Sequence, residues 1–307
     1  MKAYKGFNPD MKCRGFQYEE GKEYTTEKAK CCNSGFHACE YPLDCLDYYE
    51  PNKSVYHEVE VDGDIDHDGC DTKVAATKIK IGARLSIAGL VKAAIDYTMK
   101  RIKPEAKADE NHAACSATGD KSACSATGDN SACSATGDKS ACSATGYNSA
   151  CSATGDKSAC SATGYKSACS ATGDNSACSA TGYNSACSAT GDNSACSATG
   201  DKSACSATGD NSACSATGDN SACSATGDNS ACSADNPTAV AVAWGIHGKA
   251  RGVLGAHIVL ADWRMDEDCD WYFHGAKMVR IDGKRYKPDT WYRLDNGKVV
   301  EVKGEEA

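Results

Sequence analysis

The sequence predicts a mainly β protein built around a two-sided β-solenoid, and three observations lead to this fold class. The unit S-A-C-S-A-T-G-[DY]-[NK] recurs every nine residues between residues 115 and 234. Each unit joins a strand-like run of small residues to a turn that begins with glycine. Tyrosine replaces aspartate after the glycine only at Tyr147, Tyr165 and Tyr183, which are 18 residues apart. We therefore expect two units, or 18 residues, to form one coil.

The repeats divide the chain into three predicted parts. An α+β domain covers residues 1–108, the nonapeptide β-solenoid covers residues 109–236, and widened terminal coils with a β-hairpin cap cover residues 237–307. At ~4.8 Å per coil, about seven coils give a rod roughly 30–35 Å long. A solenoid exposes unpaired strands at each end, so both flanking parts are expected to cap it.

The turn residues predict what the two long edges of the rod display. Because residues 18 apart stack on successive coils, the three tyrosines should form a single file along one edge. Lys121, Lys139 and Lys157 share this spacing on the opposite edge, whereas Lys166 and Lys202 fall on the tyrosine edge. The remaining turns carry aspartate, so the rod should display ladders of tyrosine, aspartate and lysine.

Alternation along each strand leaves two choices for the side chains that fill the interior. One choice buries Ser122, Cys124 and Ala126 and leaves alternate residues such as Ala123 and Thr127 outside. We expect this choice, because free thiols are among the most buried side chains and exposed thiols oxidise readily. All inward residues are then small, so the two sheets should lie unusually close together. The buried serine hydroxyls need partners on neighbouring coils or on backbone carbonyls.

One cysteine per unit builds a predicted thiol column. Its members are Cys115, Cys124, Cys133, Cys142, Cys151, Cys160, Cys169, Cys178, Cys187, Cys196, Cys205, Cys214, Cys223 and Cys232. Three interpretations stay open: small packing residues, disulfides across the core, or thiolate ligands for Cu or Zn. We favour packing, because no histidine accompanies the column and a dry interior offers no route for metal entry. We therefore expect no cofactor, with copper or zinc at the thiols as the alternative.

Two other ligands fit the repeats less well. Calcium-binding nonapeptides follow a G-G-x-G-x-D pattern, whereas each unit here has a single glycine. The flat outer face is compatible with ice binding, but its threonines form one column per face instead of paired columns.

The N-terminal part reads as strands followed by a helix. Strands are expected at residues 1–7, 53–65 and 74–85, where apolar residues alternate with polar ones. Ser86 is a candidate N-cap for a helix over residues 86–102, which Pro104 ends. Because the helix leads toward the first coil, we expect it to cap that end of the rod.

Two sets of N-terminal residues carry potential chemistry. The first contains sulfur and imidazole groups: Cys13, Cys31, Cys32, His37, Cys39 and Cys45. Its spacing matches no standard pair of zinc knuckles, so structural cysteines are expected. The second set follows an order similar to an ADP-ribosyltransferase core: Tyr4, Lys5, Gly6, Gly35, Phe36, His37, Tyr49, and Glu58 or Glu60.

The C-terminal part continues the alternation with larger residues. Val240, Val242 and Trp244 share one face, and we expect them to thicken the core. Two hairpins are predicted, at residues 282–283 (Asp-Gly) and 296–297 (Asn-Gly). Three of its tryptophans, Trp263, Trp271 and Trp291, should supply most of the apolar mass of the cap.

Composition excludes several classes of protein. The chain has 33 Lys and Arg against 42 Asp and Glu, and this charge of −9 argues against phosphate-backbone binding of nucleic acid. No apolar run is long enough to span a membrane, and the N-terminus lacks the apolar core of a secretory signal. We expect a cytoplasmic protein of a bacterium or of a phage-infected cell.

The flanks resemble a family with no known activity. YKGF at residues 4–7, CRGFQYEEGKEY at 13–24, GFHACEYPLD at 35–44 and the ending AWGIHGKARGVLGAHIVLADW with DTWYRLDNGKVVEV are similar to an uncharacterised phage and gut-bacterial family. Its members place nine-residue repeats between the same flanks, often of the form A-K-I-G-S-S-G-D-D. The resemblance aligns isoleucine with the cysteine column, which implies an inward Cys124 and a replaceable cysteine.

Together these features favour a structural or interaction protein and not an enzyme. A rigid rod would display its tyrosine, aspartate and lysine ladders to a protein partner or to copies of itself. The alternatives are a soft-metal protein that uses the thiol column and an ADP-ribosyltransferase-like enzyme in the N-terminal domain.

Overall fold

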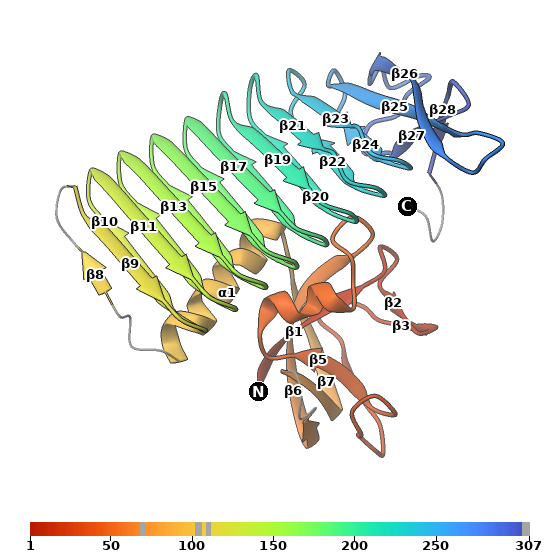
Figure 1. The fold of residues 1–307 in the computed structure, drawn as a ribbon. Coiled ribbons are helices and arrows are strands. Elements are labelled where there is room, and N and C mark those ends of the chain that lie inside the picture. Colours follow the sequence, from red (N-terminus) through yellow and green to blue (C-terminus); the bar gives the residue numbers. More distant parts are fainter. Residues whose placement is uncertain (68–71, 102–105, 109–111, 303–307) are drawn as a thin grey trace.

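A β-solenoid runs through the middle of the chain, with an N-terminal domain against one side and a β cap at the far end (Figure 1). The structure is a computed structural model and describes residues 1–67, 72–101, 106–108 and 112–302. The predicted boundary between residues 108 and 109 adjoins a stretch outside the described residues.

Two parallel sheets form the walls of the solenoid. The covered sheet contains β8 (Ala106–Ala108), β10 (Ala123–Thr127), β12 (Ala141–Thr145), β14 (Ala159–Thr163), β16 (Ala177–Thr181), β18 (Ala195–Thr199), β20 (Ala213–Thr217), β22 (Ala231–Ala234) and β24 (Lys249–Gly252). The open sheet contains β9 (Ala114–Thr118), β11 (Asn130–Thr136), β13 (Asn148–Thr154), β15 (Lys166–Thr172), β17 (Asn184–Thr190), β19 (Ala204–Thr208), β21 (Ala222–Ala225), β23 (Val240–Ala243) and β25 (His257–Met265).

The strand register confirms the predicted coil. Cys124 pairs with Cys142 in the covered sheet and Cys133 pairs with Cys151 in the open sheet, so each residue stacks on the residue 18 positions later. Cysteine therefore lies on cysteine in both sheets, as do the serine, alanine and threonine of the unit.

The interior contains the predicted serine, cysteine and alanine columns. Cys124 and Ala126 are fully buried or nearly so, and Ser158 is 0% exposed. The Ser158 hydroxyl donates to the Gly137 carbonyl at 3.2 Å, while the Ser158 amide donates to the hydroxyl of Ser176 at 3.2 Å. Cysteines that face each other across the core have Cα atoms only 5.9 to 6.2 Å apart. The core is thus much thinner than the ~10 Å usual between stacked sheets.

The N-terminal domain is a strongly curved antiparallel sheet. Its strands are β1 (Lys2–Phe7), β4 (Glu23–Thr25), β5 (Phe36–Cys39), β6 (Val55–His67) and β7 (Lys73–Leu85), in the order β4-β7-β5-β1-β6. Because β6 also pairs with β7, the sheet closes on itself. The predicted alternation holds, since Val59, Val61, Ile79 and Ile81 are all buried. A small hairpin of β2 (Lys12–Cys13) and β3 (Phe16–Gln17) and a 3₁₀ helix, η1 (Pro42–Asp47), complete the domain.

The predicted helix forms, but its position differs from the prediction. Helix α1 (Ile87–Arg101) begins after Ser86, whose hydroxyl accepts the Gly89 amide at 3.2 Å; Ile102 and Pro104 lie outside the described residues. The helix does not lie over the end of the first coil. It crosses the outer face of the covered sheet and contacts β12, β14, β16 and β18 (Figure 1).

This packing corrects the prediction that Ala123 and its equivalents are exposed. On the covered sheet Ala123, Ala141, Ala159, Ala177 and Ala195 are all 0% exposed. The last four form one apolar cluster with side chains of α1 and η1. Small side chains let the helix approach the sheet closely, so alanine suits this face as well as the interior.

The C-terminal cap differs from its prediction in three ways. Val240 and Val242 lie outward and the alternate alanines inward, so the core thickens later in the chain, from Ile258 and Leu260 onward. Residue Gly283 belongs to a turn without a hairpin; β25 instead pairs with β26 (Trp271–Arg280). The tryptophans lie toward the surface, and the apolar mass comes from residues such as Ile281.

The second predicted hairpin is present. β27 (Tyr292–Asp295) and β28 (Lys298–Glu301) pair around Asn296 and Gly297, which have φ angles of 47° and 72°. Both angles lie in the left-handed region that a two-residue Asn-Gly turn requires.

Candidate functional site

The thiol column is an uninterrupted file of sulfur atoms inside the rod. Five pairs that face each other across the core lie at disulfide-bonding distance: Cys115–Cys124, Cys142–Cys151, Cys160–Cys169, Cys205–Cys214 and Cys223–Cys232. Their Cα separations fall within the range that disulfides accept. Cys133, Cys178, Cys187 and Cys196 continue the same column as thiols.

Three of the four free thiols of the column are poorly suited to ionise, whereas hydrogen bonds from Cys178 and Cys196 overcome burial and lower the pKa of Cys187 to about 6. Burial raises the pKa of Cys133 to about 12 and raises the pKa of Cys178 and Cys196 as well. Groups of three sulfur atoms, such as those of Cys196, Cys205 and Cys214, lie within 4.8 Å of one another. Metal binding would require thiolates, so the protonated thiols of Cys133, Cys178 and Cys196 oppose it and Cys187 does not. The column is in the first place a packing element of the core.

The tyrosine edge carries the file of rings that the 18-residue spacing requires. The ring centroids of Tyr147 and Tyr165 are 5.0 Å apart, those of Tyr165 and Tyr183 are 5.2 Å apart, and both pairs are stacked within 7° of parallel. The three side chains are 40 to 54% exposed. The ammonium of Lys202 lies 5.5 Å from the Tyr183 ring centroid and extends the file.

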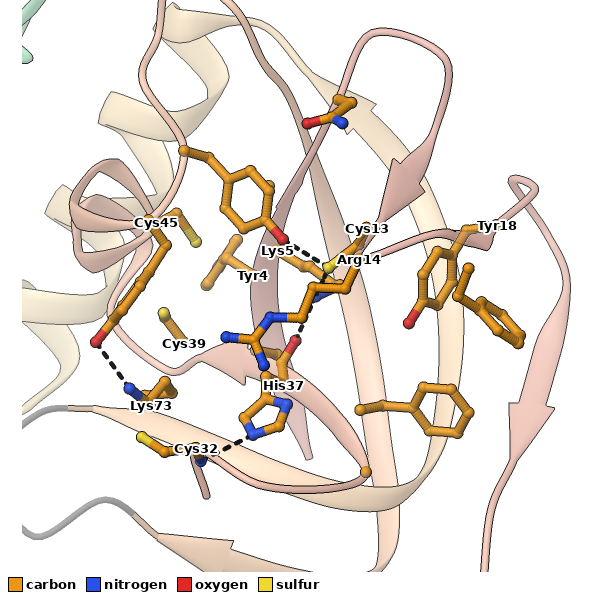
Figure 2. Close-up of a pocket in the computed structure, with 18 of the residues that line it drawn as sticks. Tyr4, Lys5, Cys13, Arg14, Tyr18, Cys32, His37, Cys39, Cys45 and Lys73 are labelled. Carbon is orange, nitrogen blue, oxygen red and sulfur yellow. Dashed lines mark hydrogen bonds between the residues drawn. The ribbon is translucent and has the colours of Figure 1, made fainter. Parts of the chain in front are cut away.

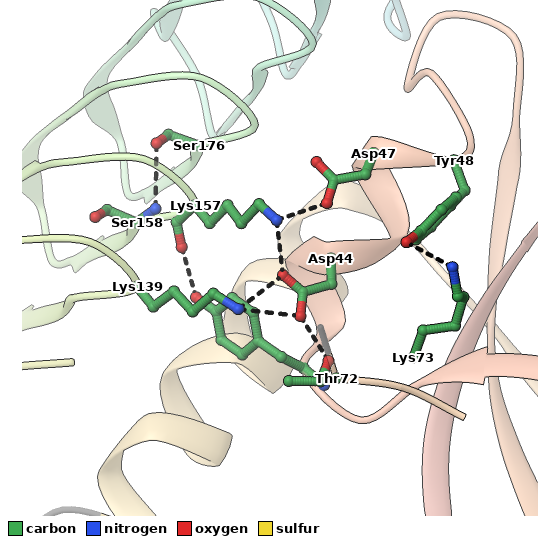
Figure 3. Close-up of polar contacts among 10 residues, drawn as sticks. Asp44, Asp47, Tyr48, Thr72, Lys73, Lys139, Lys157, Ser158 and Ser176 are labelled. Atoms are coloured by element: carbon green, nitrogen blue, oxygen red, sulfur yellow. Dashed lines mark hydrogen bonds and ion pairs between the residues drawn. The ribbon is translucent and has the colours of Figure 1, made fainter. Parts of the chain in front are cut away.

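The lysine edge, in contrast, is occupied by the chain's own N-terminal domain (Figure 3). Helix η1 presents Asp44, which is 0% exposed, between Lys139 and Lys157; each ammonium lies 3.2 Å from its carboxylate. Lys157 also pairs with Asp47 at 2.5 Å, and the hydroxyl of Tyr41 donates to the Lys157 carbonyl at 2.6 Å. Lys139 and Lys157 therefore bind the chain's own N-terminal domain and are not available to another protein.

Charge pairing sets the protonation of this contact. Burial opposes the charge on Lys157, but hydrogen bonds and charge interactions with Asp47 and Asp44 outweigh it and raise the pKa of the lysine. Lys157 therefore stays protonated at neutral pH.

The aspartate ladder on the same edge is also used within the rod. The Asp156 carboxylate accepts the Asp174 amide at 3.0 Å, and the Asp174 carboxylate accepts the Asp192 amide at 3.0 Å. The pattern continues to the Ile246 amide, which donates to Asp228 at 3.1 Å. Each carboxylate thus ties its turn to the next coil.

The outer face of the open sheet is a periodic surface that remains exposed in the described part of the chain. Its outward columns are alanine, serine and threonine, as at Ala132, Ser134 and Thr136 in β11, and the alanines stay exposed from β9 to β21. Because these side chains are small, the cysteines beneath them keep 4 to 6% exposure at Cys133 and Cys115. The face is flat and carries no charge except at its rim, where Lys166 lies.

A cavity of about 610 Å³ lies in the N-terminal domain (Figure 2). It is lined by Lys5, Arg14 and Lys73, together with His37 and several aromatic rings. Lys5 is 4% exposed, and its ammonium donates to the His37 carbonyl at 2.8 Å and to the Cys13 sulfur at 3.6 Å. Burial lowers the pKa of His37, and the charges of Lys5, Arg14 and Lys73 lower it further.

The two sets of N-terminal residues predicted from the sequence have different outcomes at this cavity. Among the described residues, groups of three possible metal ligands occur only in the thiol column, so the N-terminal cysteines and His37 do not form such a group. Tyr4, Lys5, Gly6, Gly35, Phe36, His37 and Tyr49 do line the cavity. Glu58 instead pairs with Lys2 at 2.7 Å and lines another cavity, and Glu60 is exposed. Neither glutamate of the set that is similar to an ADP-ribosyltransferase core therefore lines this cavity.

Sequence reasoning missed the basic character of this cavity, because Arg14 and Lys73 belong to separate segments. A signal was nevertheless present. The segments YKGF, CRGFQY and GFHAC, on which the family resemblance depends, all contribute lining residues.

The fold and surfaces together define a β-solenoid protein with an appended N-terminal domain. Residues 1–93 match the family model of a domain of unknown function, DUF7666, so an uncharacterised domain accounts for this part. Neither the curated proteins nor the solved structures contain a match. In the described part of the chain, no helix has the length and apolar character needed to cross a membrane. A relationship to phage proteins stays a prediction.

Proposed function

We propose that this chain is a structural and interaction protein whose open sheet binds a second copy of the chain, face to face. One observation carries the proposal. The same nonapeptide builds both outer faces of the rod, and one of them already holds a protein surface, α1, against its alanine column. The other face offers the same columns without a covering element among the described residues.

The chemistry of the open face favours another solenoid as its occupant. Its columns repeat at the ~4.8 Å strand spacing, and a surface with the same period matches them along the whole rod. Alanine, serine and threonine lose little side-chain entropy on burial. Although the chain has a net charge of −9, the face itself is uncharged within its rim, so two copies meet there without apposing like charges.

The size of the face is sufficient for a specific contact. Seven strands at ~4.8 Å and five residues at ~3.3 Å give a surface of about 34 by 16 Å. Burying it on both partners removes roughly 1,100 Å² from water, which lies near the lower limit for a biological interface. A two-fold arrangement closes the assembly as a dimer.

Sedimentation velocity over a range of protein concentrations tests the proposal. The wild type is expected to form a dimer at micromolar concentrations. Ala168→Arg places a long charged side chain in the middle of the open face and should shift the protein to monomer by at least tenfold in Kd.

Thr217→Arg is the matched control, because Thr217 is exposed on the covered sheet beyond the strands that α1 contacts. It should leave the dimer unchanged. A wild type that stays monomeric at every concentration contradicts the proposal, as does an Ala168→Arg dimer.

Soft-metal binding is a second candidate function, favoured by the groups of three sulfur atoms in the thiol column. Elemental analysis after purification under reducing conditions without chelators tests it. Copper or zinc retained in stoichiometric amount supports this function, and a metal-free column excludes it. Mass spectrometry after alkylation of the unfolded chain then reports how many of the five cross-core pairs are oxidised.

A further inference from the structure

The cavity of the N-terminal domain is basic in an otherwise acidic protein. Lys5, Arg14 and Lys73 line it, whereas no aspartate or glutamate does among the described residues. In the same part of the chain neither Lys5 nor Arg14 forms an ion pair, since each lies beyond pairing distance of every described carboxylate. The positive charges of Lys5 and Arg14 are therefore not neutralised by the described residues around them.

Lys5 is the clearest sign that a ligand supplies the missing charge. Its ammonium has three donors, and the structure gives it two weak or neutral acceptors, the His37 carbonyl and the Cys13 sulfur. The rings of Phe7, Tyr18 and Tyr49 surround it at 5.4 to 5.8 Å. A buried cation without an anionic partner is costly, so an anion in the cavity would be strongly held.

Arg14 is positioned to meet such an anion. It occupies the first turn position of the hairpin between β2 and β3, with φ of 49°, followed by Gly15 with φ of 80°. Figure 2 shows its guanidinium reaching into the cavity above His37. A guanidinium binds phosphate or carboxylate through two parallel hydrogen bonds, which adds geometric selectivity to the charge.

An aromatic wall adjoins these cations. Phe16 and Phe36 face each other edge to face at 6.1 Å, Tyr18 and Phe36 at 6.3 Å, and Phe16 is 45% exposed. The exposed ring of Phe16, backed by the buried Phe36 and set beside cations, suits a ligand that combines a planar ring with negative charge.

We propose that this cavity binds a small aromatic anion of nucleotide size, with its phosphate groups against Lys5 and Arg14 and its ring against Phe16 and Phe36. The volume of about 610 Å³ suits such a molecule. The site is separate from the open sheet and does not depend on dimerisation.

Calorimetric titration of the full chain with ADP tests this assignment, with adenosine and inorganic phosphate as its two halves. ADP should bind at least tenfold more tightly than either half, and its affinity should fall as salt is raised. Arg14→Ala should weaken ADP binding at least tenfold, because it removes a charge-assisted contact. Arg14 is exposed on a hairpin turn, so this variant keeps the fold.

Lys28→Ala is the control, since Lys28 is an exposed cation of the same domain outside the cavity lining; it should bind ADP as the wild type does. Lys5→Met gives a second reading: it should weaken ADP binding while raising the melting temperature of the free protein, because it removes a buried uncompensated charge. No binding of ADP at millimolar concentration, or equal affinity of Arg14→Ala and wild type, overturns the proposal.

Discussion

Glycine at the first turn position is the residue on which the close stacking of coils depends. A Cβ atom at Gly164 would lie 1.6 Å from the carbonyl oxygen of Gly146 in the preceding coil. That oxygen belongs to the backbone of a stacked turn, so it has no side-chain freedom with which to give way.

Gly164→Ala is therefore expected to lower the free energy of unfolding by at least about 2 kcal/mol. Gly275→Ala is the matched control, because a Cβ there would meet nothing within 4 Å. It should change stability by less than about 0.5 kcal/mol. Urea-unfolding midpoints measure both variants, and equal midpoints would show that the turns are not in close contact.

Lys249 shows how a single buried charge makes stability depend on pH. The residue is 3% exposed in β24, with its ammonium 5.3 Å from the Trp291 ring centroid. Burial lowers its pKa from 10.5 to about 8, and the charge of Lys53 contributes to the shift. Below pH 8 Lys249 is protonated in both the folded and the unfolded state. The folded state is then destabilised by the full free energy of burying the charged ammonium.

Between pH 8 and 10.5 the folded state loses this proton first, so the contribution of Lys249 becomes more favourable as pH rises. Lys249→Met should therefore stabilise the protein at pH 7 by up to about 3 kcal/mol. The difference should vanish near pH 10.5. Thermal unfolding of both proteins across this range measures it, and a variant less stable than wild type at pH 7 would refute the assignment.

At the scale of elements, a buried carboxylate in η1 attaches the N-terminal domain to the rod. Asp44→Asn leaves Lys139 and Lys157 facing a neutral amide and also alters the contact with Thr72, whose hydroxyl donates to Asp44 at 2.5 Å. Removal of one partner from a buried ion pair costs about 3–5 kcal/mol. We expect the free energy of unfolding to fall by an amount near the lower end of this range, because Lys157 keeps its ion pair with Asp47.

Asp96→Asn is the control for this prediction, since Asp96 pairs with Lys92 on the exposed face of α1. It should cost less than about 0.5 kcal/mol in the same urea titration. Adding Lys139→Met to Asp44→Asn should recover part of the loss. Equal effects of the two asparagine variants would mean that the domain is held by apolar contacts alone.

The elements also show what the sequence alone supplies. The 18-residue spacing of Tyr147, Tyr165 and Tyr183 was enough to predict the coil and the register, and the preference of free thiols for burial predicted the inward set of side chains. It was not enough to predict which face α1 covers, because the same unit builds both sheets. The available signal was the restriction of Lys139 and Lys157 to one parity of turns, beside which the acidic η1 docks.

The cavity was harder to predict for a different physical reason. Its charge comes from Lys5, Arg14 and Lys73, which lie on a strand, a hairpin turn and another strand far apart in the sequence. The pairing of β1 and β7 with the two edges of β5 brings Lys5 and Lys73 together, and strand pairing of this range is not encoded in any local pattern.

At the scale of the whole molecule, the rod can change length without rearranging its sheets only in steps of one 18-residue coil. Deleting residues 203–220 removes β19 and β20 together and returns every later strand to its own sheet. Deleting residues 203–211 removes β19 alone, so each later strand moves to the opposite sheet. The hairpin of β25 and β26 then moves to the side of the rod that holds the N-terminal domain.

The longer deletion is therefore expected to be the milder one. It should keep the β-type circular dichroism spectrum, shorten the maximum dimension by about 5 Å in X-ray scattering, and melt within a few degrees of wild type. The nine-residue deletion should melt at least about 10 °C lower, because it moves the cap and every later strand to the opposite sheet. If the protein lacking residues 203–211 were as stable as the protein lacking residues 203–220, the two sheets would be interchangeable. The attachment of the N-terminal domain to one sheet would then not contribute to the stability of the fold.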